Sequence, residues 1–103
     1  MNIIIVGCGK VGQTLAEQLN EEGNNITVVD IRAEVVQSLS ARLDVMGFVG
    51  NGATHTVQEE AGIAKTDLLI AVTGSDELNL LCCTIAKKVG SGISAIARVR
   101  NPD

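Results

Sequence analysis

Three glycines near the amino terminus have a spacing that suits close contact with a phosphate group. They belong to the run Gly7, Cys8, Gly9, Lys10, Val11 and Gly12, which follows an apolar segment and precedes one with helical periodicity. Gly7 permits a sharp turn off a strand, Gly9 leaves the backbone open to a pyrophosphate, and Gly12 permits close packing of helix on sheet. A helix that begins here directs free N–H groups and its positive dipole end at the same point. Lys10 adds a positive charge.

A carboxylate ends the second apolar run of the chain, residues 26–29. Asp30 stands there, where an acid is expected to accept hydrogen bonds from ribose hydroxyls. Its negative charge would repel a 2′-phosphate, so we predict a preference for NAD over NADP. Arg32 could serve a 2′-phosphate, but a solvated turn residue is the simpler interpretation. Together with the glycine run, Asp30 predicts a bound adenine nucleotide.

Two small polar loops follow later apolar runs, at the edge of a parallel sheet where ligands bind. In the first, residues 50–54, Asn51 lies between two glycines; the loop is either a plain turn or a neighbour of the adenosine half. In the second, Thr73 and Gly74 lie against the ribose and second phosphate, or Thr73 caps the next helix through capping-box spacing with Asp76.

Two arginines, Arg98 and Arg100, arrive at the same edge from the last expected strand, residues 93–99. They could form salt bridges with surface carboxylates. Alternatively, one of them reaches a nucleotide phosphate or a partner subunit. The sequence leaves both interpretations open.

Residues suited to catalysis or metal binding are few. His55 is the only histidine, and we expect it in the first turn of a short helix in which Thr56 and Glu59 have capping-box spacing. The three cysteines lack a disulfide pattern and metal-ligand spacing. Cys82 falls on a predicted buried helix face, and Cys83 lies beside it; the apolar members of that face are Leu78, Leu81, Ile85 and Val89. The sequence therefore predicts neither a catalytic residue nor a metal site.

The elements that position these residues alternate between strand and helix along the chain. Apolar runs at 3–6, 26–30, 45–49, 68–72 and 93–99 predict strands, and the segment after the first glycines predicts a helix whose buried stripe is Val11, Leu15 and Leu19. The chain has 103 residues, 46% of them hydrophobic, and one aromatic residue, Phe48. This favours one Rossmann-like α/β domain over residues 1–103: a doubly wound parallel sheet of about five strands with helices on both faces.

Charge and length exclude several other classes. The net charge is -4 and the pI is near 4.8, which argues against binding to nucleic acid or to an anionic membrane surface. The amino-terminal apolar run is too short for a signal peptide or a membrane span. Unpaired cysteines favour a reducing cytoplasm. Because the chain stops at Asn101, Pro102 and Asp103, just after a fifth strand, we expect a piece of a longer protein.

Several of these motifs, in this order, resemble the amino-terminal domain of TrkA-type regulators of potassium uptake, also called KTN or RCK domains. The motifs are residues 3–12, 26–30, 50–54, 67–79 and 96–102. The resemblance implies a cytoplasmic, peripheral subunit that binds NAD or NADH, or ATP or ADP in related members. It also implies control of a membrane potassium transporter and assembly into a homodimer or larger homo-oligomer.

Carried over residue by residue, the resemblance implies a phosphate loop at residues 7–12 and a ribose acid at Asp30. It places a post-strand contact at Thr73 and Gly74, and an effector-facing arginine at Arg98. We therefore expect a regulatory module that transforms no substrate. The alternative from another class is the cofactor-binding domain of an NAD-dependent dehydrogenase whose substrate domain lies elsewhere in the protein.

Overall fold

The computed structural model describes residues 1–90 and 92–100 as alternating strands and helices. The five strands form one sheet in the order β3-β2-β1-β4-β5, with every pair parallel. The elements in chain order are β1 Asn2–Val6, α1 Lys10–Glu21, β2 Asn25–Asp30, α2 Ala33–Arg42, β3 Met46–Val49, α3 His55–Glu60, the 3-10 helix η1 Ile63–Lys65, β4 Leu68–Ala71, α4 Asp76–Val89 and β5 Ser94–Ala97. The predicted Rossmann-like doubly wound fold is confirmed.

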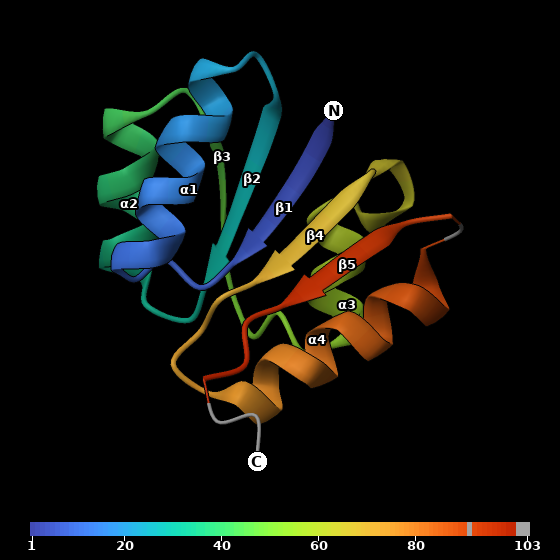
Figure 1. The fold of residues 1–103 in the computed structure, drawn as a ribbon. Coiled ribbons are helices and arrows are strands. Elements are labelled where there is room, and N and C mark those ends of the chain that lie inside the picture. Colours follow the sequence, from blue (N-terminus) through green and yellow to red (C-terminus); the bar gives the residue numbers. More distant parts are fainter. Residues whose placement is uncertain (91, 101–103) are drawn as a thin grey trace.

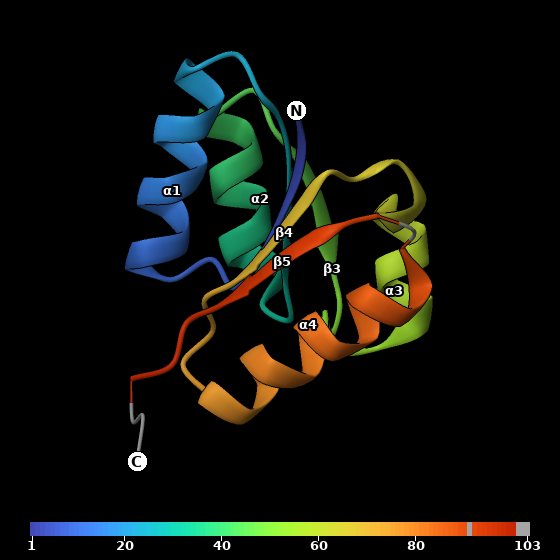
Figure 2. The same cartoon turned by 45° about the vertical axis from the view of Figure 1, so that its right-hand side comes forward.

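Helices cover both faces of the sheet, α1 and α2 on one and α3 and α4 on the other (Figures 1 and 2). Alternate side chains of β1 pack into the cores on the two faces of the sheet, because successive residues of a strand point to opposite faces. Ile3 and Ile5 join the core under α1 and α2, whereas Ile4 and Val6 join the core that contains Cys82 of α4. The central strand β1 is thus buried on both sides, as is usual for a parallel sheet covered by helices on both faces.

The order of the strands reverses beside β1. The chain moves outward from β1 to β2 and β3, then returns to place β4 on the other side of β1. Val6 therefore has Val29 of β2 as one neighbour and Ala71 of β4 as the other. The connections after β1 and β4 leave toward opposite faces, and such a switch point opens a crevice at the carboxyl ends of the strands.

The buried faces of two helices differ from the prediction. In α4 the buried residues are Asn79, Cys82 and Ala86, whereas Leu78 and Leu81 are 40% and 46% exposed. The apolar run there is continuous enough to fit more than one face, and the hydrogen bonds of Asn79, described below, turn that side chain inward.

Helix α1 also buries a face of small residues rather than the predicted stripe of large ones. Gly12 and Ala16 are its buried residues, and Leu15 and Leu19 pack at the margin of the core. Val11, predicted to be buried, is 40% exposed. The small residues let the helix axis approach the sheet closely, which leaves the larger side chains at the sides.

Two predicted helix caps are each displaced from the residue that performs the role. Thr54, not Thr56, accepts a hydrogen bond from the Val57 N–H at the start of α3. Ser75, not Thr73, does so for Leu78 at the start of α4. Residue 91, within the predicted helix end at 90–92, lies outside the described residues. So do residues 101–103, which include the last part of the motif at 96–102 and the predicted chain end.

Strand β5 is shorter than the predicted 93–99, although the Arg98 N–H still donates to the Ala71 carbonyl oxygen at 2.9 Å. No helix formed by the described residues combines the length and the apolar character that a membrane span requires.

Candidate functional site

A cleft of about 720 Å³ opens at the carboxyl ends of the strands, where the strand order reverses. Most of the predicted site residues line it, although they come from distant parts of the chain: Gly7, Gly9, Lys10, Val11, Asp30, Asn51, Thr73, Gly74 and Arg98. The fold thus brings together the loops after β1, β2, β3, β4 and β5. Cys8 and Gly12 do not line the cleft, but each contacts a residue that does: the Cys8 N–H donates to Asp30, and Gly12 packs against the Gly7 carbonyl.

The three fingerprint glycines have three different surroundings. Gly7 has a φ of +104°, and a Cβ there would lie 2.8 Å from the Thr73 nitrogen. A Cβ on Gly12 would collide with the carbonyl oxygen of Gly7. A Cβ on Gly9 would have no neighbouring atom within 4 Å. Gly7 and Gly12 are therefore required by packing, whereas Gly9 borders open space at the start of α1, where an anion would meet the helix N-terminus.

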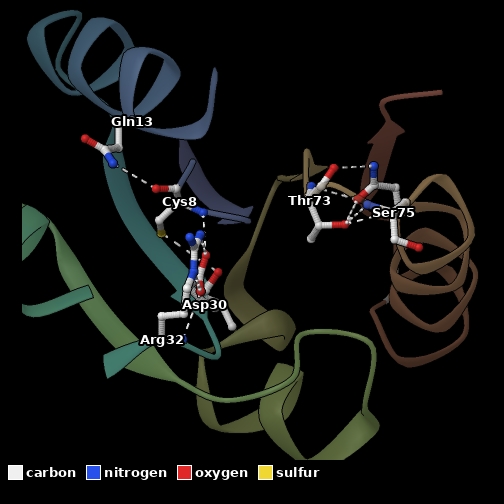
Figure 3. Close-up of polar contacts among 8 residues, drawn as sticks. Cys8, Gln13, Asp30, Arg32, Thr73 and Ser75 are labelled. Carbon is white, nitrogen blue, oxygen red and sulfur yellow. Dashed lines mark hydrogen bonds and ion pairs between the residues drawn. The ribbon is translucent and has the colours of Figure 1, made fainter. Parts of the chain in front are cut away.

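Asp30 is the buried acid of the cleft, with a side chain only 6% exposed. Its Oδ2 accepts from the Cys8 N–H at 2.8 Å and from Arg32 Nη2 at 2.9 Å, while Oδ1 accepts from the Arg32 N–H and Nε, both at 2.9 Å (Figure 3). Hydrogen bonds from the Arg32 side chain are the main reason why the pKa of Asp30 falls to about 2. Burial acts in the opposite direction. The ionised carboxylate is thus held in one orientation.

Arg32 has a contact that the sequence analysis did not predict. Its side chain is 51% exposed, as expected of a solvated turn residue, but its guanidinium also forms a two-pronged ion pair with Asp30 and lines the cleft. The spacing contained the signal: an arginine two positions after a strand-end aspartate can fold back on it. The ion pair also compensates the charge on which the predicted repulsion of a 2′-phosphate depended.

The cysteines and the histidine have surroundings that do not activate them for catalysis. Burial raises the pKa of Cys8 to about 12 and that of Cys82 to about 11, and it also raises the pKa of Cys83. These thiols are protonated at neutral pH and are poor nucleophiles. His55 is exposed and lies 2.7 Å from Glu59 within α3. Within residues 1–90 and 92–100, no group of three His, Cys, Asp or Glu side chains could hold a metal ion.

Asn79 organises the opposite wall, and its role was also missed. It is fully buried, and its Oδ1 accepts from the Thr73 N–H at 2.8 Å and from Thr73 Oγ1 at 2.6 Å. Its Nδ2 donates to the carbonyl oxygens of Thr73 at 3.2 Å and Arg98 at 2.9 Å. One amide thus joins the loop after β4 to the end of β5. A polar residue inside an apolar helical run was the available signal.

The loop after β3 is both a turn and a wall of the cleft. Asn51 Oδ1 accepts from the Ala53 N–H at 2.9 Å, so its side chain stabilises the turn itself. The buried Gln58 side chain donates to the carbonyl oxygens of Gly52 at 2.9 Å and Cys82 at 3.0 Å. These bonds fix the loop against α4.

The two arginines after β5 have different surroundings. Arg98 lines the cleft. Arg100 Nη2 donates to the Gly74 carbonyl oxygen at 2.6 Å, and its backbone N–H donates to Asp76 Oδ1 at 3.0 Å. Arg100 therefore secures the loop after β4, which leaves Arg98 as the cleft-lining arginine on this side.

The chain is similar to known proteins both in sequence and in fold. The chain is 46% identical over 97% of its length to the Trk system potassium uptake protein TrkA of Halomonas elongata, of which it spans 22%. Its fold matches that of the TrkA-N domain of the inner membrane protein ybaL from Escherichia coli, with a TM-score of 0.87 and 25% identity over 94% of this chain and 71% of that one. The GsuK channel bound to NAD has the same fold, with a TM-score of 0.85 and 22% identity over 98% of this chain and 18% of that one.

The model of the TrkA-N domain family matches residues 3–103, which is nearly the whole chain. The matched range includes the glycine run, Asp30 and the loops that form the cleft. The chain belongs to the TrkA-N domain family.

Proposed function

We propose that this domain binds NAD or NADH in the cleft and, as part of a Trk-type system, regulates potassium uptake through a membrane transporter. The observation that carries the proposal is the convergence of the glycine loop, Asp30, Thr73, Gly74 and Arg98 on one cleft. The names of its relatives support it: one is a Trk system potassium uptake protein, and a channel of the same fold is bound to NAD.

Each wall of the cleft has a chemical role in this proposal. The pyrophosphate lies over Gly9 at the start of α1, where backbone N–H groups, the helix dipole and Lys10 favour an anion. Asp30 accepts hydrogen bonds from ribose hydroxyls. Thr73 and Gly74 contact the second half of the dinucleotide, and Arg98 supplies a positive charge from the other side. ATP or ADP could use the same phosphate and ribose contacts and are the alternative ligands.

Regulation requires that two nucleotides stabilise different states to different degrees, because a ligand shifts an equilibrium only by its differential affinity. The transporter partner, assembly into a homodimer or larger homo-oligomer, and a cytoplasmic location at the inner face of the membrane belong to the same proposal. The net charge of -4 argues against nucleic acid as a partner.

The test is calorimetric titration of the purified domain with NAD, NADH, ATP and ADP at one salt concentration. We expect NAD and NADH to bind with different affinities. Gly9→Val is the loss-of-binding variant, since a Cβ there meets no atom within 4 Å in the free protein and the added side chain would occupy the phosphate position. Gln18→Val is the control for a new valine, because Gln18 is an exposed residue of the same helix and does not line the cleft. Absence of binding by the unaltered domain would contradict the proposal.

A dehydrogenase cofactor domain is the second candidate, because the fold is shared with such enzymes. The buried, protonated thiols and the exposed His55 give no acid, base or nucleophile for it within the described residues. Steady oxidation of NADH by the full-length protein with a small substrate would favour this candidate over the regulatory one.

A further inference from the structure

We propose that Arg32 sets the nucleotide affinity of this domain by competing with the ribose hydroxyls for Asp30. The inference rests on the proposed nucleotide site and concerns what happens there before the ligand arrives. Its starting point is that the carboxylate on which the ribose would bind already has a partner from the same chain.

The acceptor capacity of Asp30 is filled. A carboxylate offers about four acceptor positions on its two oxygens. Four donors occupy them: the backbone N–H groups of Cys8 and Arg32, and the Nε and Nη2 groups of the Arg32 side chain. A ribose diol needs two of these positions in order to donate both hydroxyls.

Only the two side-chain donors can leave. The Cys8 N–H belongs to the glycine turn, whose Gly7 N–H donates to the Val29 carbonyl oxygen at 2.8 Å. The Arg32 N–H lies at the start of α2, where the Arg32 carbonyl accepts from Val36 at 3.2 Å. The Arg32 side chain, by contrast, is 51% exposed, so rotation would move its guanidinium into water. Ribose binding at Asp30 therefore requires the guanidinium to withdraw.

This exchange opposes binding. The pair is a side-on, charge-assisted interaction, which is stronger than a hydrogen bond between neutral groups. The hydroxyls that replace it are neutral donors. Part of the free energy of nucleotide binding is therefore spent on separating Arg32 from Asp30.

The experiment measures the dissociation constants of NAD, ADP and 2′-deoxy-ADP for the unaltered domain, Arg32→Ala and Arg32→Met. We expect both variants to bind NAD and ADP roughly three- to tenfold more tightly, because two acceptor positions are free from the start. The gain should be smaller for 2′-deoxy-ADP, which keeps the phosphates but lacks one of the competing hydroxyls. Arg32→Met keeps an unbranched side chain without the charge and without a hydrogen-bond donor, and it guards against a defect specific to alanine.

Two controls isolate the competition. Arg42→Ala removes an exposed arginine that contacts Glu17 at 3.4 Å and should leave all three affinities unchanged. In an Asp30→Ala background, Arg32→Ala should produce no gain, because there is no carboxylate left to compete for. A gain of equal size in that background would show a general effect of charge and overturn the inference.

The outcomes also separate this inference from the proposed function. If the unaltered domain binds NAD and the Arg32 variants bind it equally or more weakly, the competition is wrong and the nucleotide site stands. If a parallel titration with NADP shows that the variants lose affinity for NADP alone, the inference is overturned and Arg32 is a 2′-phosphate ligand instead. If neither the unaltered domain nor any Arg32 variant binds a nucleotide, both proposals fail.

Discussion

The two walls of the cleft are organised by different chemistry. On the β2 side, a buried carboxylate is held by an arginine whose side chain is half exposed. On the β4 side, the fully buried neutral amide of Asn79 is bonded to the backbone of Thr73 and of Arg98. The first contact can open without disturbing the core, and the second cannot. In the proposed nucleotide site, the exposed Arg32 side chain would leave Asp30 on binding, whereas the buried Asn79 amide would keep its contacts.

The largest expected effect comes from the point where the walls meet. Gly7→Ala should lower the free energy of unfolding by roughly 3 to 5 kcal/mol, because the residue has a φ of +104° and its Cβ would press on Thr73 backbone atoms. Gly62→Ala is the matched control: its φ is +92°, but a Cβ there meets no atom within 4 Å. It should lose only about 1 to 2 kcal/mol. Urea denaturation measures both losses. Equal losses for the two variants would show that a Cβ at residue 7 does not clash with the Thr73 backbone.

Removal of the buried amide should have the next largest effect. Asn79→Ala leaves the Thr73 N–H and the Arg98 carbonyl without their partner and should cost about 2 to 3 kcal/mol of stability. Thr84→Ala, which removes an exposed hydroxyl from the same helix, should cost less than about 0.5 kcal/mol. If thermal unfolding of the two variants coincides, the contrast between the walls is wrong.

On the β2 side, the charge pair should show itself in acid. The pKa of Asp30 is about 2 in the folded domain, below its ordinary value of 3.8. The stability that the ionised carboxylate contributes is therefore complete above about pH 4 and is lost as the pH falls toward 2. Arg32→Ala removes the main cause of the shift, so its stability should decline less steeply across this range. The measurement is the free energy of unfolding of the two proteins at several pH values. An equal decline from pH 4 to pH 2 would contradict this prediction.

The smallest effect is expected from the second arginine pair of the same half. Arg42 and Glu17 lie 3.4 Å apart with side chains 49% and 50% exposed. Water screens such a pair, so Arg42→Ala should change the free energy of unfolding by less than about 0.5 kcal/mol. If Arg42→Ala lowered the free energy of unfolding as much as Asn79→Ala, the solvent exposure of a contact would not predict its contribution to stability.

The sequence predicted the sheet well because each strand carries its own signal. Every connection between the five apolar runs includes a helix, and this pattern favours a parallel sheet with helices on both faces. The glycine run and Asp30 then placed the cleft, since open α/β sheets bind ligands at a switch point.

The remainder depended on contacts between residues far apart in the chain. The face that α4 buries is set by the bonds from Asn79 to Thr73 and Arg98, and no local periodicity reports such bonds. Both helix caps were missed by two positions because several neighbouring residues are able to cap. Arg32 is exposed as predicted, but its ion pair with Asp30 was not predicted, because the sequence alone does not show the direction of its side chain.

Asn79 also makes a mechanical link. A single side chain bonds to the backbone of Thr73 and to the backbone of Arg98, which directly follows the carboxyl end of β5, and both residues line the cleft. Because the amide belongs to α4, we expect a displacement of the loop after β4 to be transmitted to that helix and to the end of β5 together.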